Sequence, residues 1–308
     1  MIPSVCVLMS TYCGEKYVAE QIDSILRQKD VHIYLYIRDD GSNDNTKNIL
    51  EKYKNENNNI KIKFGRNIGV GNSFMNLLYS VPDIFDYYAF SDQDDIWDAD
   101  KVCVAIDLLK KSGKILYTSN QECINAFGVS QGLRYSKNQN VYTSCIGVLQ
   151  CNMIAGCTFL FDKVLKIKLS QKDHRPTKDL LKQRIHDVWV INVAALTDDV
   201  IYDNESHMKY RQHKDNVIGV NSHGWAYDLK QKSKKVFFKE QRNGRSKLGK
   251  ELWRCFSNNI KEREIIYACY TYSDFKSKKI LIKNKDRLRS YSGETRIGIT
   301  LKIILNLF

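Results

Sequence analysis

"YYAFSDQDDIW", residues 87–97, runs from aromatic and apolar residues directly into a group of acids. The apolar run is typical of a buried strand, and Asp92, Asp94 and Asp95 follow it within four positions. Carboxylates held this close repel one another, so something must offset the repulsion. A hard divalent cation would do so, because it takes carboxylate oxygens as ligands and completes its shell with water and phosphate oxygens. The alternative is a solvated turn before a helix, a position that suits Asp98 and Asp100.

The sequence around this stretch alternates strand-like and helix-like patterns. Strands are expected at 4–12, 32–40, 60–67, 86–94 and 114–120, and helices at 15–28, 45–56, 72–81 and 98–111. Such alternation with short connections predicts an α/β fold with a mostly parallel sheet flanked by helices. Polar residues follow four of these strands, and the carboxyl ends of parallel strands meet at one rim, where ligands bind. The sequence therefore predicts a ligand site that includes the acids.

The pattern is looser after residue 120. A helix is expected at 186–197 with His186 and Asp187 at its start, followed by short strands at 200–204 and 208–213. An acid at the start of a helix is ordinarily a cap, so position alone does not give Asp187 a catalytic role. From about residue 224 the chain is basic and compatible with helix.

The charge of the chain is unevenly distributed. Residues 1–219 hold 27 Lys and Arg against 27 Asp and Glu, whereas residues 220–308 hold 21 against 8. We expect two parts, an α/β domain at 1–220 that holds the predicted ligand site and a basic, mainly helical extension at 221–308. Residues 224–308 could bind an anionic membrane surface, mediate homo-oligomer formation, or be a solvated face of packed helices. No nucleic-acid-binding motif accompanies the charge, so nucleic acid is not an expected partner.

The cysteines and the N-terminus favour a cytoplasmic protein. Nine cysteines form neither a CxxC pair nor a zinc-like spacing with histidine, which favours reduced thiols. "MIPSVCVLMS" lacks the basic region and long apolar run of a signal peptide, and no segment reaches the roughly 20 apolar residues of a spanning helix. We expect a cytoplasmic location, with peripheral attachment at the inner face of the cell membrane as an option through the basic extension.

Several linked motifs resemble family-2 glycosyltransferases of the GT-A (Rossmann-like) fold, and in particular the bacterial polysaccharide branch that includes rhamnosyltransferases. The likeness covers residues 3 to about 220, outside the basic extension. In chain order the motifs are "STYCGEKYVAEQIDSILRQ" (10–28), "IRDDGSNDNT" (37–46), "GRNIGVGNSF" (65–74), "FSDQDDIWDADK" (90–101), "AGCTFLFDK" (155–163), "HDVWV" (186–190) and "YRQHKDNVIG" (210–219).

The resemblance implies a role for individual positions. "DQD" matches the DxD motif, so that Asp94 and Asp92 would hold Mg²⁺ or Mn²⁺, with Asp95 secondary. His213 is a candidate further metal ligand, with a phosphate contact or an ordinary surface histidine as the alternatives. Asp187 matches the general base, and Asp39 the acid that supports the turn after the second strand. The nucleotide-binding positions that it implies are Thr11, Tyr12, Glu15, Asp40, Asn67, Gly69, Asp92 and Arg211.

These positions suit an inverting, metal-dependent sugar transfer. A divalent cation and nearby cations can neutralise a leaving diphosphate, and one carboxylate can take the proton of the attacking hydroxyl. The resemblance implies a pyrimidine nucleoside diphosphate donor, with dTDP-rhamnose favoured and a UDP-hexose as the alternative. The acceptor would be a saccharide or lipid-linked saccharide in surface polysaccharide biosynthesis, such as capsule or O-antigen.

Two other readings remain open from the residues. Asp94 and Asp187 could be the acid pair of a glycoside hydrolase, although the nucleotide-type strand ends would then have no role. A non-catalytic nucleotide-sugar-binding or scaffold protein of the same fold would need a broken DxD motif or a missing base, and both are intact here.

Overall fold

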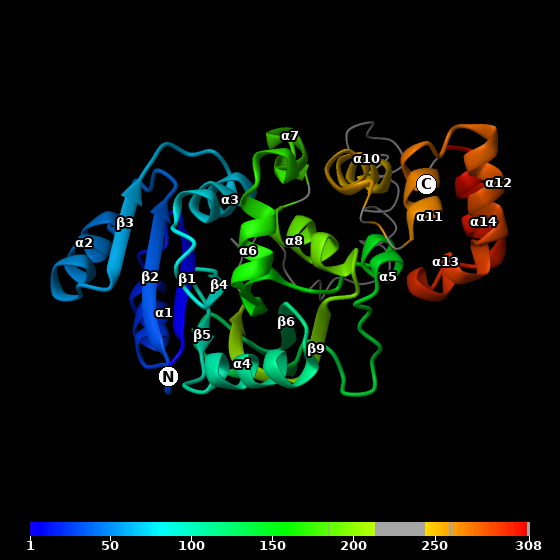
Figure 1. The fold of residues 1–308 in the computed structure, drawn as a ribbon. Coiled ribbons are helices and arrows are strands. Elements are labelled where there is room, and N and C mark those ends of the chain that lie inside the picture. Colours follow the sequence, from blue (N-terminus) through cyan, green and yellow to red (C-terminus); the bar gives the residue numbers. More distant parts are fainter. Residues whose placement is uncertain (184, 213–243, 259, 261, 307–308) are drawn as a thin grey trace.

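The structure, a computed structural model, describes residues 1–183, 185–212, 244–258, 260 and 262–306 (Figure 1). Its strands are β1 (Ser4–Thr11), β2 (His32–Asp39), β3 (Ile60–Phe64), β4 (Tyr87–Ser91), β5 (Ile96–Trp97), β6 (Leu116–Ile124), β7 (Ser130–Leu133), β8 (Leu160–Asp162) and β9 (Val200–Arg211). The first helices are α1 (Val18–Leu26), α2 (Thr46–Glu56), α3 (Val70–Ser80) and α4 (Lys101–Ser112). The later ones are α5 (Cys145–Gln150), η1 (Gly156–Thr158), α6 (Lys163–Ser170), η2 (Lys172–His174), α7 (Lys178–Gln183) and α8 (His186–Ala195), then α10 (Gly244–Phe256), α11 (Arg263–Tyr270), α12 (Phe275–Lys283), α13 (Lys285–Ser292) and α14 (Arg296–Ile304).

The described strands form one sheet in the order β3-β2-β1-β4-β8-β6-β9-β5, with β7 paired to β6. β3, β2, β1 and β4 are parallel, and their register brings Thr11 beside Asp39, Asp39 beside Phe64, and Met9 beside Ser91. The carboxyl ends of these four strands therefore lie at one rim, as the sequence predicts. β8 runs antiparallel to β4 and β6, and β5 runs antiparallel to β9, so the second half of the sheet is mixed.

The structure corrects two details of the sequence-based prediction. The two short strands expected at 200–204 and 208–213 are one strand, β9, whose pairing with β6 shifts register near Asn120. The turn expected after the acids contains a further strand, β5, which pairs with residues 208–209 of β9. This short pairing fixes where the chain goes directly after Asp95.

Both faces of the sheet are buried at the central strands β1, β4 and β6, which explains the strongly apolar sequences of β1 and β4. In β1, Val5, Val7 and Met9 pack with α1 and α4, whereas the alternate residues Cys6 and Leu8 pack with α3 and α8. This alternation follows from the period of two in a strand. The rim is thereby held between two packed layers.

The C-terminal helices pack on the body. Leu248, Leu252 and Phe256 of α10 belong to the same apolar cluster as Trp189 of α8. Figure 1 shows α11 to α14 at the end of the molecule opposite α2 and β3. Among the described residues, no helix is both long and apolar enough to span a bilayer. The expected boundary near residue 220 falls in 213–243, outside the described residues.

Candidate active site

Asp39 holds the turn that follows β2. Its Oδ1 accepts hydrogen bonds from the N–H groups of Gly41 (3.2 Å) and Ser42 (3.0 Å). Its Oδ2 accepts from the hydroxyls of Thr11 (3.1 Å) and Ser42. Gly41 has φ +88°, a conformation that favours glycine. Asp39 therefore supports the turn, as its place in the "DDGS" motif predicts, and Thr11 is part of that support.

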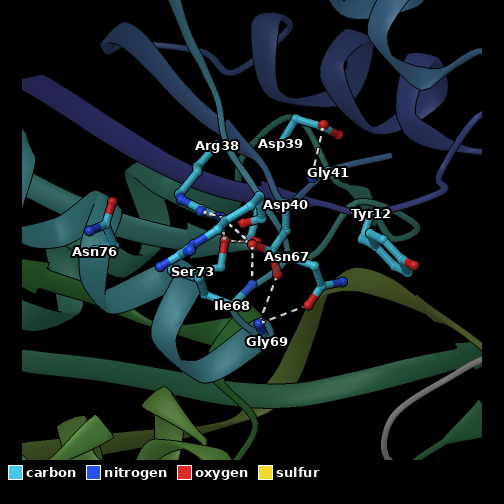
Figure 2. Close-up of polar contacts among 12 residues, drawn as sticks. Tyr12, Arg38, Asp39, Asp40, Gly41, Asn67, Ile68, Gly69, Ser73 and Asn76 are labelled. Carbon is cyan, nitrogen blue, oxygen red and sulfur yellow. Dashed lines mark hydrogen bonds and ion pairs between the residues drawn. The ribbon is translucent and has the colours of Figure 1, made fainter. Parts of the chain in front are cut away.

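Asp40 links the end of β2 to the loop before α3 (Figure 2). The N–H groups of Ile68 and Gly69 each donate to a different carboxylate oxygen, both at 2.9 Å, and Arg38 forms an ion pair with Oδ1. Asp40 is 3% exposed. A carboxylate has about four acceptor positions, so one remains at Oδ2 after these contacts. Recognition of a pyrimidine base by Asp40 stays a prediction that this free position permits.

Further positions that the motifs predict to bind the nucleotide lie around the same rim. Asn67 accepts a hydrogen bond from the Gly69 N–H through Oδ1 at 3.1 Å, and Gly69 has φ +84° at the start of α3. Glu15 accepts from the Asn45 N–H at 2.8 Å, which joins the loop after β1 to the start of α2. The side chains of Asn67 and Glu15 are exposed. These contacts therefore order the loops and leave both residues accessible to a ligand.

Gln93, the middle residue of "DQD", ties the acids to the loop after β1. Its Oε1 accepts from the Tyr12 N–H at 2.8 Å, and its Nε2 donates to the Tyr12 carbonyl at 3.0 Å. A Cβ at Gly14 would lie 2.3 Å from Gln93 Oε1, so a side chain at position 14 would displace the Gln93 amide. The Tyr12 side chain itself is about half exposed, at 49%. Gln93 carries no signal of its own in the sequence, because the DxD pattern defines only the two acids around it.

The acids after β4 converge with a thiol. Asp92, Asp95 and Cys157 each offer a ligand atom, and these atoms lie within 4.8 Å of one another. Burial raises the pKa of Asp92 to about 7, and the charges of Asp94 and Asp187 add to the shift. The pKa of Asp95 is also raised well above its ordinary value, first by burial and then by Asp94 and Asp92. The repulsion inferred from the sequence is therefore present in the folded chain.

The carboxylates of this cluster fit a hard divalent cation. Asp95 is 1% exposed, and its Oδ2 accepts no hydrogen bond within the described ranges. Mg²⁺ and Mn²⁺ prefer oxygen ligands, whereas a thiol is a soft ligand. Burial raises the pKa of Cys157 well above its ordinary value and keeps the thiol protonated. Asp92 and Asp95 are thus the fitting pair in the cluster, Asp94 lies near both, and His213 lies outside the described residues.

Asp187 lies beside the acid cluster at the start of α8. Its Oδ1 accepts from its neighbour Val188 N–H at 2.6 Å, and a Cβ at Gly156 would lie 2.9 Å from its own Cβ. Burial raises the pKa of Asp187 to about 6, with Val188, Gly156 and Arg134 opposing the shift. Gly156 directly precedes Cys157 of the acid cluster, and the charge of Asp187 adds to the raised pKa of Asp92, so Asp187 lies within electrostatic reach of the cluster. The fold brings the predicted base and the DxD motif to one place.

His186 belongs to the core. Its ring stacks on Phe74 with centroids 3.9 Å apart and meets Phe90 edge-on at 4.9 Å. Burial lowers its pKa to about 3, so the imidazole is neutral at physiological pH. Its position next to Asp187 in the sequence does not make it part of an acid–base pair.

Arg211 holds the acidic loop in place. Its Nε donates to the Asp94 carbonyl at 2.9 Å, its Nη2 pairs with Glu20 at 2.5 Å, and its backbone N–H donates to Asp95 Oδ1 at 3.2 Å. The residue is 3% exposed. In this arrangement the guanidinium supports the acids, and contact with a diphosphate stays a prediction.

Two further cations near the acids were missed from the sequence. Arg134, just after β7, lowers the pKa of Asp187 and of Cys157, and donates to Gln121 Oε1 at 2.6 Å. Lys101 is fully buried at the start of α4, with Nζ 4.0 Å from the ring centroid of Trp97. Arg134 follows a short strand and belongs to no motif, whereas Lys101 ends the motif at 90–101 but resembles an ordinary surface lysine. Trp97 and Trp189 are both buried, and Trp189 packs against Phe256.

Comparison with known proteins identifies the family. Residues 6–166 match the model of the glycosyl transferase family 2. The chain is 33% identical over 224 residues to the dTDP-rhamnosyl transferase RfbG of Shigella flexneri, a match that spans 69% of this chain and 74% of that protein. It is 28% identical to the uncharacterized glycosyltransferase RT0329 of Rickettsia typhi, over 68% of this chain and 64% of that protein.

The fold also has solved counterparts. The crystal structure of S. aureus TarS 1–349 in complex with UDP-GlcNAc superposes with a TM-score of 0.57 and 14% identity, and the match covers 99% of this chain and 93% of that one. At this identity the likeness shows a common GT-A fold alone. Together with the matches in sequence, it shows that this chain is a glycosyltransferase and belongs to the glycosyl transferase family 2.

Proposed function

We propose that the protein is an inverting, metal-dependent glycosyltransferase that moves a sugar from a pyrimidine nucleoside diphosphate to a saccharide acceptor in surface polysaccharide biosynthesis. The observation that carries the proposal is the proximity of Asp187 to the cluster of Asp92 and Asp95, at the rim where β1, β2 and β4 end. Asp187 can then take the proton of the acceptor hydroxyl, while the other carboxylates hold the cation that neutralises the diphosphate. The family membership supports the transfer itself.

The reaction requires one displacement. Asp187 takes the proton of the acceptor hydroxyl as its oxygen attacks the anomeric carbon, and the bond from that carbon to the diphosphate oxygen breaks. Attack from the face opposite the leaving group inverts the anomeric centre. The pKa of about 6 leaves most Asp187 side chains ionised at neutral pH, as a base must be. No covalent intermediate on the protein is needed.

Asp92, Asp94 and Asp95 are the proposed residues for Mg²⁺ or Mn²⁺, with His213 as a further candidate. When bound, the cation would supply charge neutralisation for the departing diphosphate. Carboxylates that repel one another in its absence would become attracted to a common centre. Asp95 joins the two acids of the DxD motif in this proposal, because one of its buried oxygens accepts no hydrogen bond within the described ranges.

Arg134 is the proposed cation for the diphosphate, in addition to Arg211. Its charge reaches both Asp187 and Cys157, which places it at the junction of the base and the acid cluster. Arg211, in contrast, is buried against Glu20 and the Asp94 carbonyl. A guanidinium suits two phosphate oxygens at once. The proposed nucleoside contacts are Thr11, Tyr12, Glu15, Asp40, Asn67 and Gly69.

The proposed donor is dTDP-rhamnose, with a UDP-hexose as the alternative. The likeness to the Shigella dTDP-rhamnosyl transferase supports the first choice. A lipid-linked saccharide is the proposed acceptor, because the basic C-terminal part could then meet an anionic membrane surface. A catalytically inactive scaffold of the same fold is the second candidate, but the base and the acids are all present and converge.

The proposal is tested with a panel of donors. The protein is incubated with dTDP-rhamnose, UDP-glucose, UDP-galactose or UDP-N-acetylglucosamine in Mn²⁺ or in EDTA, and the released nucleotide and the thermal shift are measured. We expect one donor to stabilise the protein and to be consumed only with metal. Asp187→Asn should stop consumption while keeping the thermal shift, whereas Asp179→Asn on the exposed face of α7 should change neither. Full turnover in EDTA would refute the metal proposal, and normal turnover of D187N would refute the base.

A further inference from the structure

Helix α14 carries apolar side chains on two opposite faces. Ile299 and Ile303 are fully buried, whereas Ile297, Leu301, Ile304 and Leu305 are 74%, 49%, 50% and 60% exposed. At 100° per residue, positions separated by four and seven lie on the same side of a helix. The four exposed residues therefore form a continuous strip, called here the outer stripe. A helix of a globular protein needs only one apolar face, and the inner pair already supplies it.

Cations lie next to the outer stripe on α12. Lys276, Lys279 and Lys283, called here the α12 lysines, are exposed and share one side of the helix with Phe275, which is 84% exposed. Lys278 of the same helix donates from Nζ to the Ile304 carbonyl at 3.0 Å, so α12 lies against the end of α14. The apolar strip and the lysines therefore belong to one region of the surface.

The charge of this region is strongly positive. Residues 275–306 hold nine Lys and Arg but only two acids, Asp286 and Glu294. Both acids already form ion pairs: Asp286 pairs with Arg296 at 2.9 Å, and Glu294 pairs with Lys302 at 2.7 Å. Within the described residues the α12 lysines form no ion pair. Their charge is therefore available to an external anion.

We propose that the outer stripe, Phe275 and the α12 lysines form a docking surface for an anionic lipid bilayer. An apolar strip between cations is the arrangement that inserts at the boundary between headgroups and acyl chains. A second copy of the chain, paired through the same surface, would bring like charges together. The inference rests on the proposed lipid-linked acceptor and names the surface that reaches it. Figure 1 shows α12 and α14 at one end of the molecule, away from the strand ends of β1 to β4, so docking leaves the rim accessible.

Vesicle flotation of the full chain tests this surface without donor, metal or acceptor. We expect the protein to float with phosphatidylglycerol-rich vesicles and to stay unbound with pure phosphatidylcholine vesicles. Changing the outer stripe (Ile297→Gln with Leu301→Gln) or the lysines (Lys279→Gln with Lys283→Gln) should each weaken partition by about tenfold or more. Circular dichroism and thermal melting identify a variant that has lost its fold.

Matched controls come from other surfaces of the same chain. Ile84→Gln removes an isoleucine that is 69% exposed before β4, and Lys110→Gln with Lys111→Gln removes two exposed lysines from the end of α4. Both controls should bind vesicles as the parent does. Absence of parent binding, or unchanged binding by the folded stripe variant, would overturn the proposal. A parent dimer that the stripe variant converts to monomer, with vesicle binding unaltered, would assign the stripe to a second copy. Donor consumption is measured separately, so its failure would refute only the proposed reaction.

Discussion

Lys101 lies within electrostatic reach of Cys157 and Asp95, two members of the acid cluster. Asp95 is 1% exposed and Lys101 is fully buried, and neither Asp95 Oδ2 nor Lys101 Nζ has a hydrogen-bond partner in the described part of the chain. The charge of Asp95 opposes the loss of the Lys101 proton, although burial still lowers the pKa of that lysine to about 8. At neutral pH the lysine is therefore mostly charged. Part of the repulsion among the acids is offset by the protein itself, before any metal binds.

Lys101→Met should make the site bind Mn²⁺ more tightly. Methionine keeps the contact with the Trp97 ring but removes a positive charge that repels the cation. With an effective dielectric constant of about 20, we expect an increase in affinity of about tenfold. Titration with Mn²⁺ at neutral pH, followed by calorimetry, measures it, with Lys110→Met at the exposed end of α4 as the control. A weaker affinity in the folded variant would show that Lys101 only packs, and would contradict its role as a counter-charge.

The pH dependence of transfer should report the ionisation of Asp187. Burial raises the pKa of this carboxyl from 3.8 to about 6. A general base acts only when deprotonated, so kcat/KM should rise with pH through about 6 and then level off. Below that value it should fall about tenfold per pH unit. Donor hydrolysis across a pH series measures the profile. A profile that is flat between about pH 5 and 7 would contradict the assignment of Asp187 as the base.

At the scale of elements, α1 buries polar side chains as well as the apolar side chains that pack in the core. Gln21 and Ser24 of α1, together with Gln28 just after the helix ends at Leu26, are buried, at 0%, 1% and 8% exposure. The Gln21 side chain donates to the Ser91 hydroxyl at 2.7 Å. The Ser24 hydroxyl accepts from the backbone N–H of Trp97, and the Gln28 side chain accepts from the backbone N–H of Val102, both at 3.0 Å. One helix thus anchors the end of β4, strand β5 and the start of α4, and so fixes the acids on both sides.

Ser24→Ala should destabilise the protein through this anchor. The variant leaves the buried backbone N–H of Trp97 without its acceptor, which lowers the free energy of unfolding by about 1–3 kcal/mol. We expect the midpoint of urea unfolding to fall accordingly, and Mn²⁺ affinity to weaken because β5 follows the acids directly. Ser80→Ala is the matched control, because the Ser80 hydroxyl donates to the Leu77 carbonyl at 2.9 Å but lies exposed and, among the residues that the structure describes, accepts from no other element. Equal midpoints for the two variants would contradict the anchoring role.

The sequence predicts those elements and residues whose signal is local. The parallel strands β1, β2 and β4 show mostly apolar runs that end in polar groups, β3 alternates apolar and charged residues, and Asp39, Asp92 and Asp187 stand in recognisable motifs. In contrast, β5 has two residues and β8 has three, too few for a periodic pattern. Lys101 and Arg134 are near the acids only because of tertiary packing, which no spacing in the chain encodes. The polar side of α1 was missed because the apolar residues alone accounted for a helix.

At the scale of the whole molecule, the charge boundary does not coincide with a boundary in the core. The sequence divides at residue 220 because the basic residues begin there. In the structure, however, Phe256 of α10 is 2% exposed and packs against Trp189, with ring centroids 6.1 Å apart, and against His174 at 4.4 Å. Arg254 also donates to the Arg175 carbonyl at 2.6 Å. Net charge reports on partners and solubility, whereas shared apolar burial decides which segments fold together.

We therefore expect the body and the C-terminal helices to unfold as one unit, and Phe256→Ala tests this. Removal of a buried phenylalanine costs about 3–5 kcal/mol. In one cooperative unit that loss moves the whole transition, so strands β1 to β4 should lose hydrogen-exchange protection at the same lower urea concentration as α10. Phe275→Ala, which alters a phenylalanine 84% exposed, should leave the transition nearly unchanged. If the strands keep the parent midpoint while α10 unfolds early, the two parts are separate domains, and the division near residue 220 would describe folding as well as charge.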